Sequence, residues 1–511
     1  MAICWSSSIP ISSASGFSVS SWSAAESSVM CRLMLSMFSS ARRQDGGMTD
    51  LVTHAHDTRV VVVGGGMAGI VAALECARLG LQVTLIEAGP QLGGSLDRAT
   101  LGDLTVDAAA DGIPASAKTL AKLIDEVGLS DELETARDDE LWLGAGPAGP
   151  APAPAGTVLG IPANPWAEDV RRHIEGRGAW RAYLDRVRPP LTVGRHRSLG
   201  ELVSSRMGER VRDRLVAPYV LAVHGVAPEF IDVDAAAPSL NPALTRTGSL
   251  SGAVAQTVRP GSAQRRAPRG GLFRLIDALE ARLRDFDVDI RTGADVTEIR
   301  RERDTWLVRA DSVEEPVPSD LLIVAADEDT ARRLLSPHVE LPASAEPRPA
   351  PLDVVLLRIE GVDLPERGSL VIGPGSEPAT VRPISRTWPW IGEALAEDEH
   401  VIRVTLPHTA GSDADVVAAA RAAASDLCGV EIPAGAVRAA ARVGYSRAAP
   451  ASLLGHDEAV RAVRVRAREL PALALVGGWL SGNSLDRVAA DAIAEADAAR
   501  RAVLWRGVDP A

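Results

Sequence analysis

The chain has 511 residues, 46% of them hydrophobic, and a formal net charge of −13. This length predicts two or three domains with a sizeable buried interior. The acidic balance, without a basic stripe, argues against nucleic acid as a partner. The most apolar stretch, residues 60–79, contains four glycines, so we expect no transmembrane span, while contact with a membrane surface stays open.

Cysteine usage favours a reducing compartment. The four cysteines, Cys4, Cys31, Cys76 and Cys428, form no CxxC pair, and no cluster of histidine and cysteine has metal-ligand spacing. We therefore expect free thiols, no metal site and a cytoplasmic protein.

Residues 1–47 differ in composition from the rest of the chain. Fifteen of the first forty residues are serine, and Glu26 and Asp45 are the only acidic residues in the segment. A Ser-rich, acid-poor segment is compatible with an organelle transit peptide. We favour a disordered or non-native leader with no folded role, followed by a start at Met48.

The predicted elements begin with a βαβ unit. A strand over residues 59–63 leads into the turn Gly64-Gly-Gly-Met-Ala-Gly69, a helix that runs to about residue 79, and a second strand over 81–87. The unit occupies fewer than about thirty residues, as the start of a Rossmann-type fold does. Residues 48–113 are therefore predicted to be the first part of a nucleotide-binding domain.

The next segment, residues 114–260, is predicted to be a mainly helical domain. A Gly- and Pro-rich break interrupts it at 144–156, and residues 241–268 look polar and irregular. Helical periodicity is clearest from residue 199 onward.

The remaining segments are predicted to complete two more layers. Residues 261–345 contain a helix and then several strands, which indicates a return to the nucleotide-binding sheet. Residues 346–440 alternate strands with one helix and predict a separate α+β domain for the substrate. Residues 441–511 add a buried strand at 473–476 and a long helix to the nucleotide-binding domain.

The glycine turn has the residues that a dinucleotide requires. Gly64 permits the tight turn, Gly66 lets the backbone approach a pyrophosphate, and Gly69 allows the helix to pack close to the strand. The pyrophosphate would lie on free N–H groups at the positive end of the helix. The remaining predicted contacts in this turn are Gly65, Met67 and Ala68.

The residues after the second strand favour FAD over NAD. Glu87 is placed to accept hydrogen bonds from the adenosine ribose, and Leu92-Gly93-Gly94-Ser95 follows it, a pattern typical of glutathione-reductase-like and amine-oxidase-like flavoproteins. No second GxGxxG follows a strand, because the sequence at 371–376 lacks the third glycine. We therefore expect no NAD(P)H domain and an α/β fold in which a Rossmann-type FAD-binding domain is interleaved with the other two.

Several segments carry a family resemblance: the GG element and residues 110–116, 120–129, 198–218, 268–275, 450–456 and 477–482. In these segments the chain resembles the oxygen-dependent porphyrinogen oxidases of haem synthesis, within the amine-oxidase-like flavoproteins. The resemblance covers roughly residues 58–505. It implies further cofactor contacts at Ala88, Gly94, Ser95, Val296, Gly478, Trp479 and Val488.

The chain departs from this family at three places. Ser95 stands where arginine is usual, Ala451 and Ser452 replace polar and aromatic residues, and the final turn reads Gly482-Asn-Ser-Leu-Asp. These changes leave FAD binding as expected but bear on the substrate.

The resemblance implies that a porphyrinogen, either coproporphyrinogen III or protoporphyrinogen IX, is oxidised to the porphyrin with oxygen as acceptor. FAD carries the chemistry, and the sequence predicts no catalytic residue. Arginines would hold the propionates, but the sequence does not choose among them. His224 is better interpreted as an ordinary polar residue than as a pocket residue, and Trp388 and Trp390 as core residues rather than a stacking platform.

Two rival functions stay open. The first is an amine oxidase or a carotenoid-desaturase-like enzyme. Amine oxidases of this superfamily commonly place a lysine near the flavin, whereas Lys118 and Lys122 are the only lysines here. The second is a non-catalytic flavin-binding protein.

Overall fold

A computed structural model describes residues 54–137, 140–144, 149–187, 197–258, 264–365 and 370–505. The predicted leader at 1–47 lies outside these residues, as do Cys4 and Cys31. Cys76 is a buried free thiol, as expected, and Cys428 is also buried.

A five-stranded parallel sheet carries the predicted βαβ unit. Its strand order is β12-β2-β1-β16-β22, and every neighbouring pair is parallel. The strands are short and mostly apolar, as expected where both faces of a sheet are buried. Widely separated segments meet here, so the prediction that the chain returns to this sheet is confirmed. The strands are β1 (Arg59–Val63), β2 (Gln82–Ile86), β12 (Asp289–Arg291), β16 (Leu321–Val324) and β22 (Leu473–Leu475).

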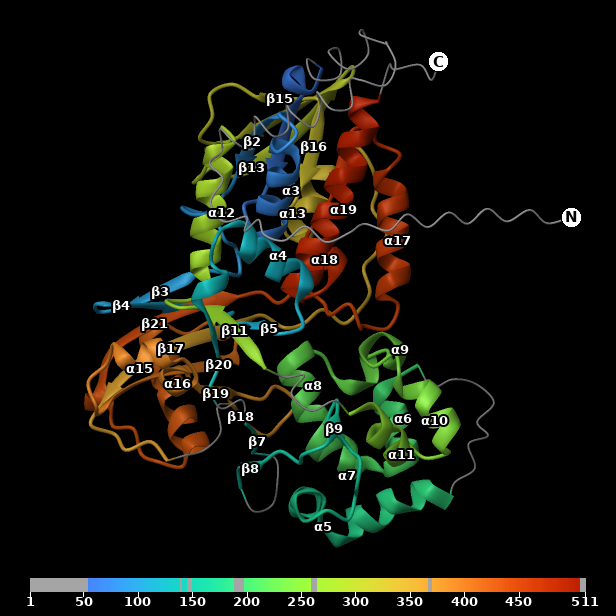
Figure 1. Ribbon diagram of the computed structural model, residues 1–511, viewed down its shortest axis with the longest axis vertical. Helices are drawn as coiled ribbons and strands as arrows, with labels where there is room; N and C mark the ends of the chain where they lie inside the picture. The colour runs from blue at the N-terminus through green and yellow to red at the C-terminus, as the bar shows by residue number, and fades with distance from the viewer. Residues whose placement is uncertain are drawn as a thin grey trace, which may run out of the picture. The chain divides into compact units, whose positions relative to one another are not determined.

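Alternate residues of these strands pack into two different hydrophobic cores, one on each face of the sheet. Val60 and Val62 face a layer of helices, whereas Val61 and Val63 face an antiparallel sheet and two further helices. Figure 1 shows the helical layer beside the strands. The helical layer is α3 (Met67–Ala77), α4 (Lys118–Glu126), α12 (Phe273–Asp285) and α19 (Leu485–Leu504); the other layer is β13 (Val296–Glu302), β14 (Thr305–Ala310), β15 (Val317–Ser319), α13 (Glu328–Leu335) and α17 (His456–Ala467).

A seven-stranded sheet forms the second domain, in the order β21-β17-β20-β19-β18-β7-β8. One face packs on α16 (Asp413–Cys428), and the other on the hairpin of β3 (Arg98–Leu101) and β4 (Leu104–Asp107) with α14 (Ile384–Thr387) and α15 (Pro389–Glu393). The strands are β7 (Leu141–Leu143), β8 (Ala151–Pro152), β17 (Leu352–Glu360), β18 (Leu370–Ile372), β19 (Thr380–Pro383), β20 (Glu399–Pro407) and β21 (Val437–Tyr445).

Two features of this domain bear on the sequence predictions. Trp388 and Trp390 are 1% and 8% exposed and belong to the core, which confirms the packing interpretation. β7 comes from the segment predicted to be mainly helical, yet it pairs in parallel with β18, more than two hundred residues later in the chain. A pairing over that distance leaves no local signal in a three-residue strand.

The third part of the structure is helical, and its helices gather in one group in Figure 1. No helix in the part of the chain that the structure describes could cross a membrane. The helices are α5 (Glu168–Tyr183), α6 (Leu199–Met207), α7 (Glu209–Val211), α8 (Ala217–His224), α9 (Val233–Ala236), α10 (Leu240–Thr247) and α11 (Leu250–Thr257).

The expectation of an irregular segment at 241–268 is wrong, because α10 and α11 lie in it. Leu240, Ala243, Leu250 and Val254 are fully buried, so an apolar face does exist. The Ser249 hydroxyl accepts a hydrogen bond from the N–H of Gly252 and caps α11. Each helix has only eight residues, and the many Ser, Thr and Gly residues between the apolar positions hide the helical period.

The remaining elements connect these parts. Short β5, β6 and β11 form a three-stranded antiparallel sheet, β9 and β10 form a hairpin, and α18 lies between β22 and α19. Their bounds are β5 (Ile113–Pro114), β6 (Leu133–Thr135), β9 (Thr157–Val158), β10 (Ile161–Pro162), β11 (Arg265–Pro268) and α18 (Gly478–Ser481).

Candidate functional site

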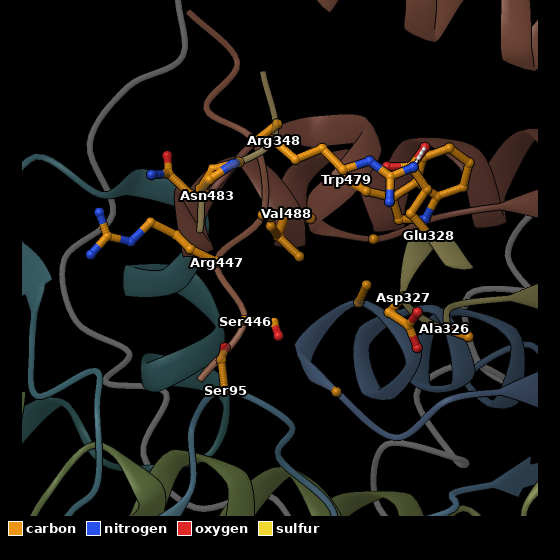
Figure 2. A pocket seen from close by; sticks show the side chains of 18 of the residues that line it. Ser95, Ala326, Asp327, Glu328, Arg348, Ser446, Arg447, Trp479, Asn483 and Val488 are labelled. Atoms are coloured by element: carbon orange, nitrogen blue, oxygen red, sulfur yellow. Dashed lines mark ion pairs between the residues drawn. The ribbon is translucent and has the colours of Figure 1, made fainter. Parts of the chain in front are cut away.

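A cavity of about 460 Å³ lies at the carboxyl ends of β1, β16 and β22. Ligands of open α/β sheets bind at this edge. The lining also includes residues that follow β21, so the cavity reaches from the nucleotide-binding sheet to the second domain. Figure 2 shows several of the lining side chains. The predicted cofactor contacts that line it are Gly66, Met67, Ala68, Ser95, Gly478, Trp479 and Val488.

The three glycines of the turn have different surroundings. Gly64 has φ +106°, and a Cβ there would lie 2.7 Å from the carbonyl oxygen of Ala325. A Cβ on Gly69 would overlap the backbone oxygen of Gly64. A Cβ on Gly66 would meet nothing closer than the Cα of Gly94, at 4.0 Å. Gly64 and Gly69 are therefore required by the fold, whereas Gly66 keeps open the space beside the cavity.

Glu87 holds this turn from the end of β2. Its Oε2 accepts a hydrogen bond from the N–H of Gly65 at 2.6 Å, and its Oε1 accepts one from the N–H of Gly89 at 2.7 Å. A carboxylate oxygen can accept more than one hydrogen bond, so the predicted ribose contacts remain compatible with this geometry. Ala88, the next residue, is exposed.

The two remaining predicted contacts lie apart from the cavity lining. Gly94 lies beside the turn, because a Cβ on it would be 3.2 Å from the Cα of Gly66. Val296 is buried at the start of β13, and its carbonyl oxygen accepts a hydrogen bond from Arg333 Nη2 at 3.2 Å.

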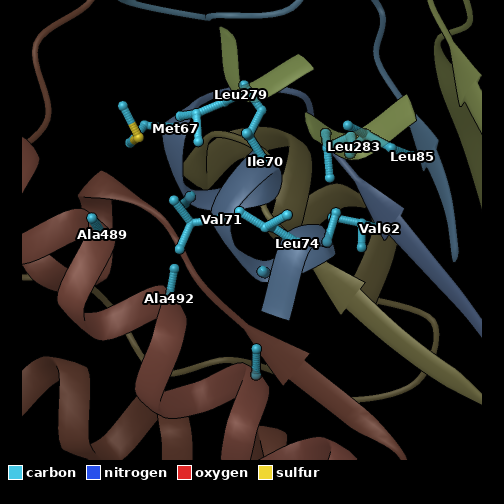
Figure 3. Packing of buried hydrophobic residues seen from close by; sticks show 14 of the residues in the cluster. Val62, Met67, Ile70, Val71, Leu74, Leu85, Leu279, Leu283, Ala489 and Ala492 are labelled. Carbon is cyan, nitrogen blue, oxygen red and sulfur yellow. The ribbon is translucent and has the colours of Figure 1, made fainter. Parts of the chain in front are cut away.

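The packing of α3 points its first turn at the cavity. Ile70, Val71 and Leu74 belong to a core that includes Leu279 and Leu283 of α12 and small residues of α19. Figure 3 shows these side chains around α3. The small residues Ala489 and Ala492 allow α19 to approach closely. No side chain caps the N-terminal end of α3, so its free N–H groups and positive dipole end are available to an anionic ligand.

The indole of Trp479 supplies a second donor at this cavity. Its Nε1 is buried and has no hydrogen-bond partner among the described residues. A buried donor without an acceptor is costly unless a ligand or water satisfies it. Together with the uncapped helix and the open space at Gly66, this donor suits FAD, which is rich in acceptors and carries a pyrophosphate.

Sequence reasoning missed an ion-pair network on one wall of the cavity. Arg348 contacts Glu328 at 3.2 Å and Asp329 at 2.8 Å, and Arg332 contacts Glu328 at 2.8 Å. Figure 2 shows Arg348 extended toward Glu328. The acidic residues could have been found, because they directly follow β16 at the ligand-binding edge of the sheet.

His224 is the last residue of α8, and it lines neither this cavity nor the smaller one next to it. Its Nδ1 lies 3.3 Å from the hydroxyl of Ser452. Burial, and then the charge of Arg447, lower the pKa of His224 to about 4, so the ring is neutral near pH 7. Ser452, which departs from the family pattern, thus contacts this histidine.

Comparisons with known proteins agree with this geometry. The chain matches the family model for flavin containing amine oxidoreductases over residues 67–442. It is 27% identical over 330 residues to a coproporphyrinogen III oxidase of Propionibacterium freudenreichii subsp. freudenreichii, which is 57% of this chain and 60% of that protein. It is 24% identical over 301 residues to a coproporphyrinogen III oxidase of Bacillus subtilis (strain 168), 56% of this chain and 62% of that protein. The match thus spans about three fifths of the length of these relatives.

The fold has a close counterpart among solved structures. A structure named "Putative protoporphyrinogen oxidase" from Exiguobacterium sp. 255-15 has a TM-score of 0.75 and 22% sequence identity, and the similarity covers 88% of this chain and 99% of that one. This likeness shows the fold. The family model matches well over half of the chain, and the protein therefore belongs to the flavin containing amine oxidoreductase family, with FAD as its cofactor.

Proposed function

We propose that this protein oxidises a porphyrinogen to the porphyrin, with coproporphyrinogen III as the preferred substrate, protoporphyrinogen IX as a second one, and oxygen as acceptor. The observation that carries the proposal is the similarity to relatives named coproporphyrinogen III oxidase over 56–57% of the chain. The cavity supports it, because one continuous lining joins the glycine turn to apolar and cationic residues after β21.

The chain's own residues would bind and position the reactants. Gly66 and the first turn of α3 would hold the pyrophosphate, Glu87 the ribose, and Trp479 an acceptor atom of the flavin. The bound FAD would supply the two-electron oxidation itself. The protein's part is to exclude water and to fix the macrocycle in the cavity.

Porphyrin fluorescence tests this proposal. Coproporphyrinogen III added in air to the FAD-loaded protein should give coproporphyrin III, with about three peroxides formed per porphyrin. Protoporphyrinogen IX should react more slowly, and salt should raise KM more steeply for the tetrapropionate. A preference for protoporphyrinogen IX would reverse the substrate assignment. No porphyrin from either compound, with FAD bound, would contradict the proposal.

An amine oxidase is the main rival within the family. Both lysines, Lys118 and Lys122, are exposed on α4 and are absent from the cavity lining. A lysine beside the flavin, common in amine oxidases of this superfamily, therefore has no candidate here. Anaerobic bleaching of the flavin by a porphyrinogen but not by primary or secondary amines would separate the two functions.

We also propose a peripheral membrane contact through an aromatic cluster, defined as Trp166, which lies just before α5, and Trp180 and Tyr183 within α5. The ring centroids of Trp166 and Trp180 lie 6.3 Å apart, and Trp180 stacks on Tyr183 at 6.3 Å. Trp180 is 57% exposed, and Val187 just beyond is 75% exposed. Arg186 lies over Tyr183. Exposed Trp and Tyr beside arginine is the composition of a membrane-interface segment.

Replacing both tryptophans of the aromatic cluster with serine should weaken sedimentation with vesicles that contain anionic lipid by about tenfold. Trp505→Ser is the matched control, because Trp505 is 58% exposed and lies far along the chain from the cluster. Equal vesicle binding by both variants and the wild type would argue against this contact.

A further inference from the structure

Arg447 differs from the other arginine that lines the large cavity. Arg348 is neutralised by Glu328 and Asp329, whereas no carboxylate in the described part of the chain lies within ion-pair distance of Arg447. The contacts of Arg447 are the carbonyl oxygens of Leu221 and Ala222, which accept hydrogen bonds from its Nη1 at 3.2 and 3.3 Å. Figure 2 shows Arg447 directed away from the network around Arg348.

The small cavity beside Arg447 is narrow, and about half of its lining is apolar. Arg447 lies two residues beyond β21 and lines both the large cavity and a second cavity of about 60 Å³. Leu221, Ala222, Ala350 and Leu352 line the small cavity with it. A space of this size holds a few water-sized groups, and a carboxylate is of that order. Glu377, which also lines it, is exposed and makes no ion pair with Arg447.

The residue that follows α8 leaves room for the guanidinium of Arg447. Gly225, directly after α8, has φ +75°, and a Cβ there would lie 2.8 Å from Nη1 of Arg447. Glycine therefore both adopts the left-handed turn and leaves room for the arginine. The C-terminal end of α8 carries a partial negative charge, which stabilises the cation in part. Its carbonyl oxygens, however, accept hydrogen bonds from Nη1 only. His224 beside it is neutral near pH 7 and adds no charge next to Arg447.

A guanidinium in an apolar setting is costly when it has no counter-ion. Burial lowers the pKa of Arg447, although an arginine keeps its proton in proteins. The remaining donors, Nη2 and Nε, have the fork geometry that matches a carboxylate. Nη2 and Nε of Arg447 are thus available to a ligand at the wall that the two cavities share.

We propose that Arg447 binds a carboxylate of the substrate at the shared wall of the two cavities, and so selects substrates that carry an acidic side arm. The inference rests on the proposed function, since it assigns the propionate contact that the sequence left open among many arginines. Arg447 would act as a specificity-determining residue, and the hydrogen bonds to α8 would fix its position.

Binding of the oxidised product tests this inference without turnover. Coproporphyrin III and its uncharged tetramethyl ester are titrated into FAD-loaded protein in the same detergent-containing buffer, and quenching of porphyrin fluorescence gives Kd. Arg447→Met should weaken binding of the acid by about tenfold to a hundredfold and leave the ester unchanged. Arg447→Lys, which keeps the charge but loses the fork, should fall between Arg447→Met and the wild type.

Arg300→Met serves as the remote control, since Arg300 is exposed on β13 and pairs with Glu298. It should match the wild type with both ligands. FAD content and circular dichroism check that each variant is folded; if Arg447→Met does not fold, Arg447→Lys decides. Equal weakening of acid and ester, or no weakening, would overturn the role of Arg447 while leaving the proposed function standing. Wild-type protein that binds neither ligand would overturn both.

Discussion

Gly66→Val is expected to give folded protein that purifies without FAD. The backbone of Gly66 has φ −73° and ψ 179°, which any residue adopts, so valine brings no conformational strain. The space around it is open in the protein, and its new side chain would occupy the path by which a pyrophosphate approaches α3. Thermal unfolding should be close to that of the FAD-free wild type, while flavin absorbance in the visible range should be lost.

Gly69→Ala is the matched variant and should show the opposite behaviour. The added methyl group would overlap the backbone oxygen of Gly64, and backbone cannot move away as a flexible side chain can. Overpacking of this kind typically costs about 1–3 kcal/mol or more, so the yield of soluble protein should fall. Stoichiometric FAD in Gly66→Val, or a Gly69→Ala protein as stable as the wild type, would contradict the roles given to these glycines.

The βαβ unit was predictable because its signals are local. Four valines in a row, a glycine turn and an Ala-rich helix fall within one short stretch, and the observed β1, α3 and β2 match the predicted segments closely. α10 and α11 were missed because their burial depends on packing against other helices rather than on a strong local period. The strand β7 was missed because its partner β18 lies far along the chain.

The cofactor side of the site could be predicted better than the substrate side. Gly66, Met67 and Trp479 belong to glycine-rich segments with a recognisable spacing, and they line the cavity. Arg348 and Arg447 could not be told from the other arginines, because what distinguishes them is whether a carboxylate lies beside each. Pairing across the fold is set by tertiary structure and leaves no pattern in the sequence.

A buried ionic cluster joins the FAD-binding domain to the seven-stranded sheet. Asp111, 7% exposed, accepts a hydrogen bond from Arg265 at 2.6 Å, contacts Arg403 of β20 at 2.9 Å and accepts one from the indole of Trp388 at 3.3 Å. Arg403 is itself 6% exposed, and its Nη2 donates to the carbonyl oxygen of Asp107 at 2.8 Å. The Asp111 carboxylate therefore lies against two guanidinium groups at the boundary of the two domains.

Asp111→Asn should strongly destabilise the protein. The amide keeps the shape but removes the carboxylate charge that lies against Arg265 and Arg403. Breaking a buried ion pair in this way typically costs about 3–5 kcal/mol. We expect Tm to fall by about 3–10 °C in calorimetry. The control Glu298→Gln removes a carboxylate from an exposed pair with Arg300, and should change stability by less than about 0.5 kcal/mol.

The pH dependence of the Tm difference between Asp111→Asn and the wild type shows whether the charge of Asp111 causes it. Burial alone would raise the pKa of Asp111, but the guanidinium groups of Arg403, Arg265 and Arg382 outweigh it and hold the pKa below its usual range. Its stabilising effect is therefore complete above the unfolded pKa of about 3.9 and is lost as the pH falls through the lower folded pKa. The Tm difference between Asp111→Asn and the wild type should shrink below about pH 4.

Two other groups shape the wild-type curve in the same range, in opposite directions. Burial raises the pKa of Asp107 to about 6, so the folded state holds a proton that the unfolded state has lost, and stability falls as the pH rises toward 6. His224, with its pKa lowered to about 4, makes stability rise over the same interval. Comparing variant and wild type at each pH removes the contribution of His224, which both proteins share. A Tm difference that stayed unchanged down to about pH 3 would show that Asp111 does not act through its charge.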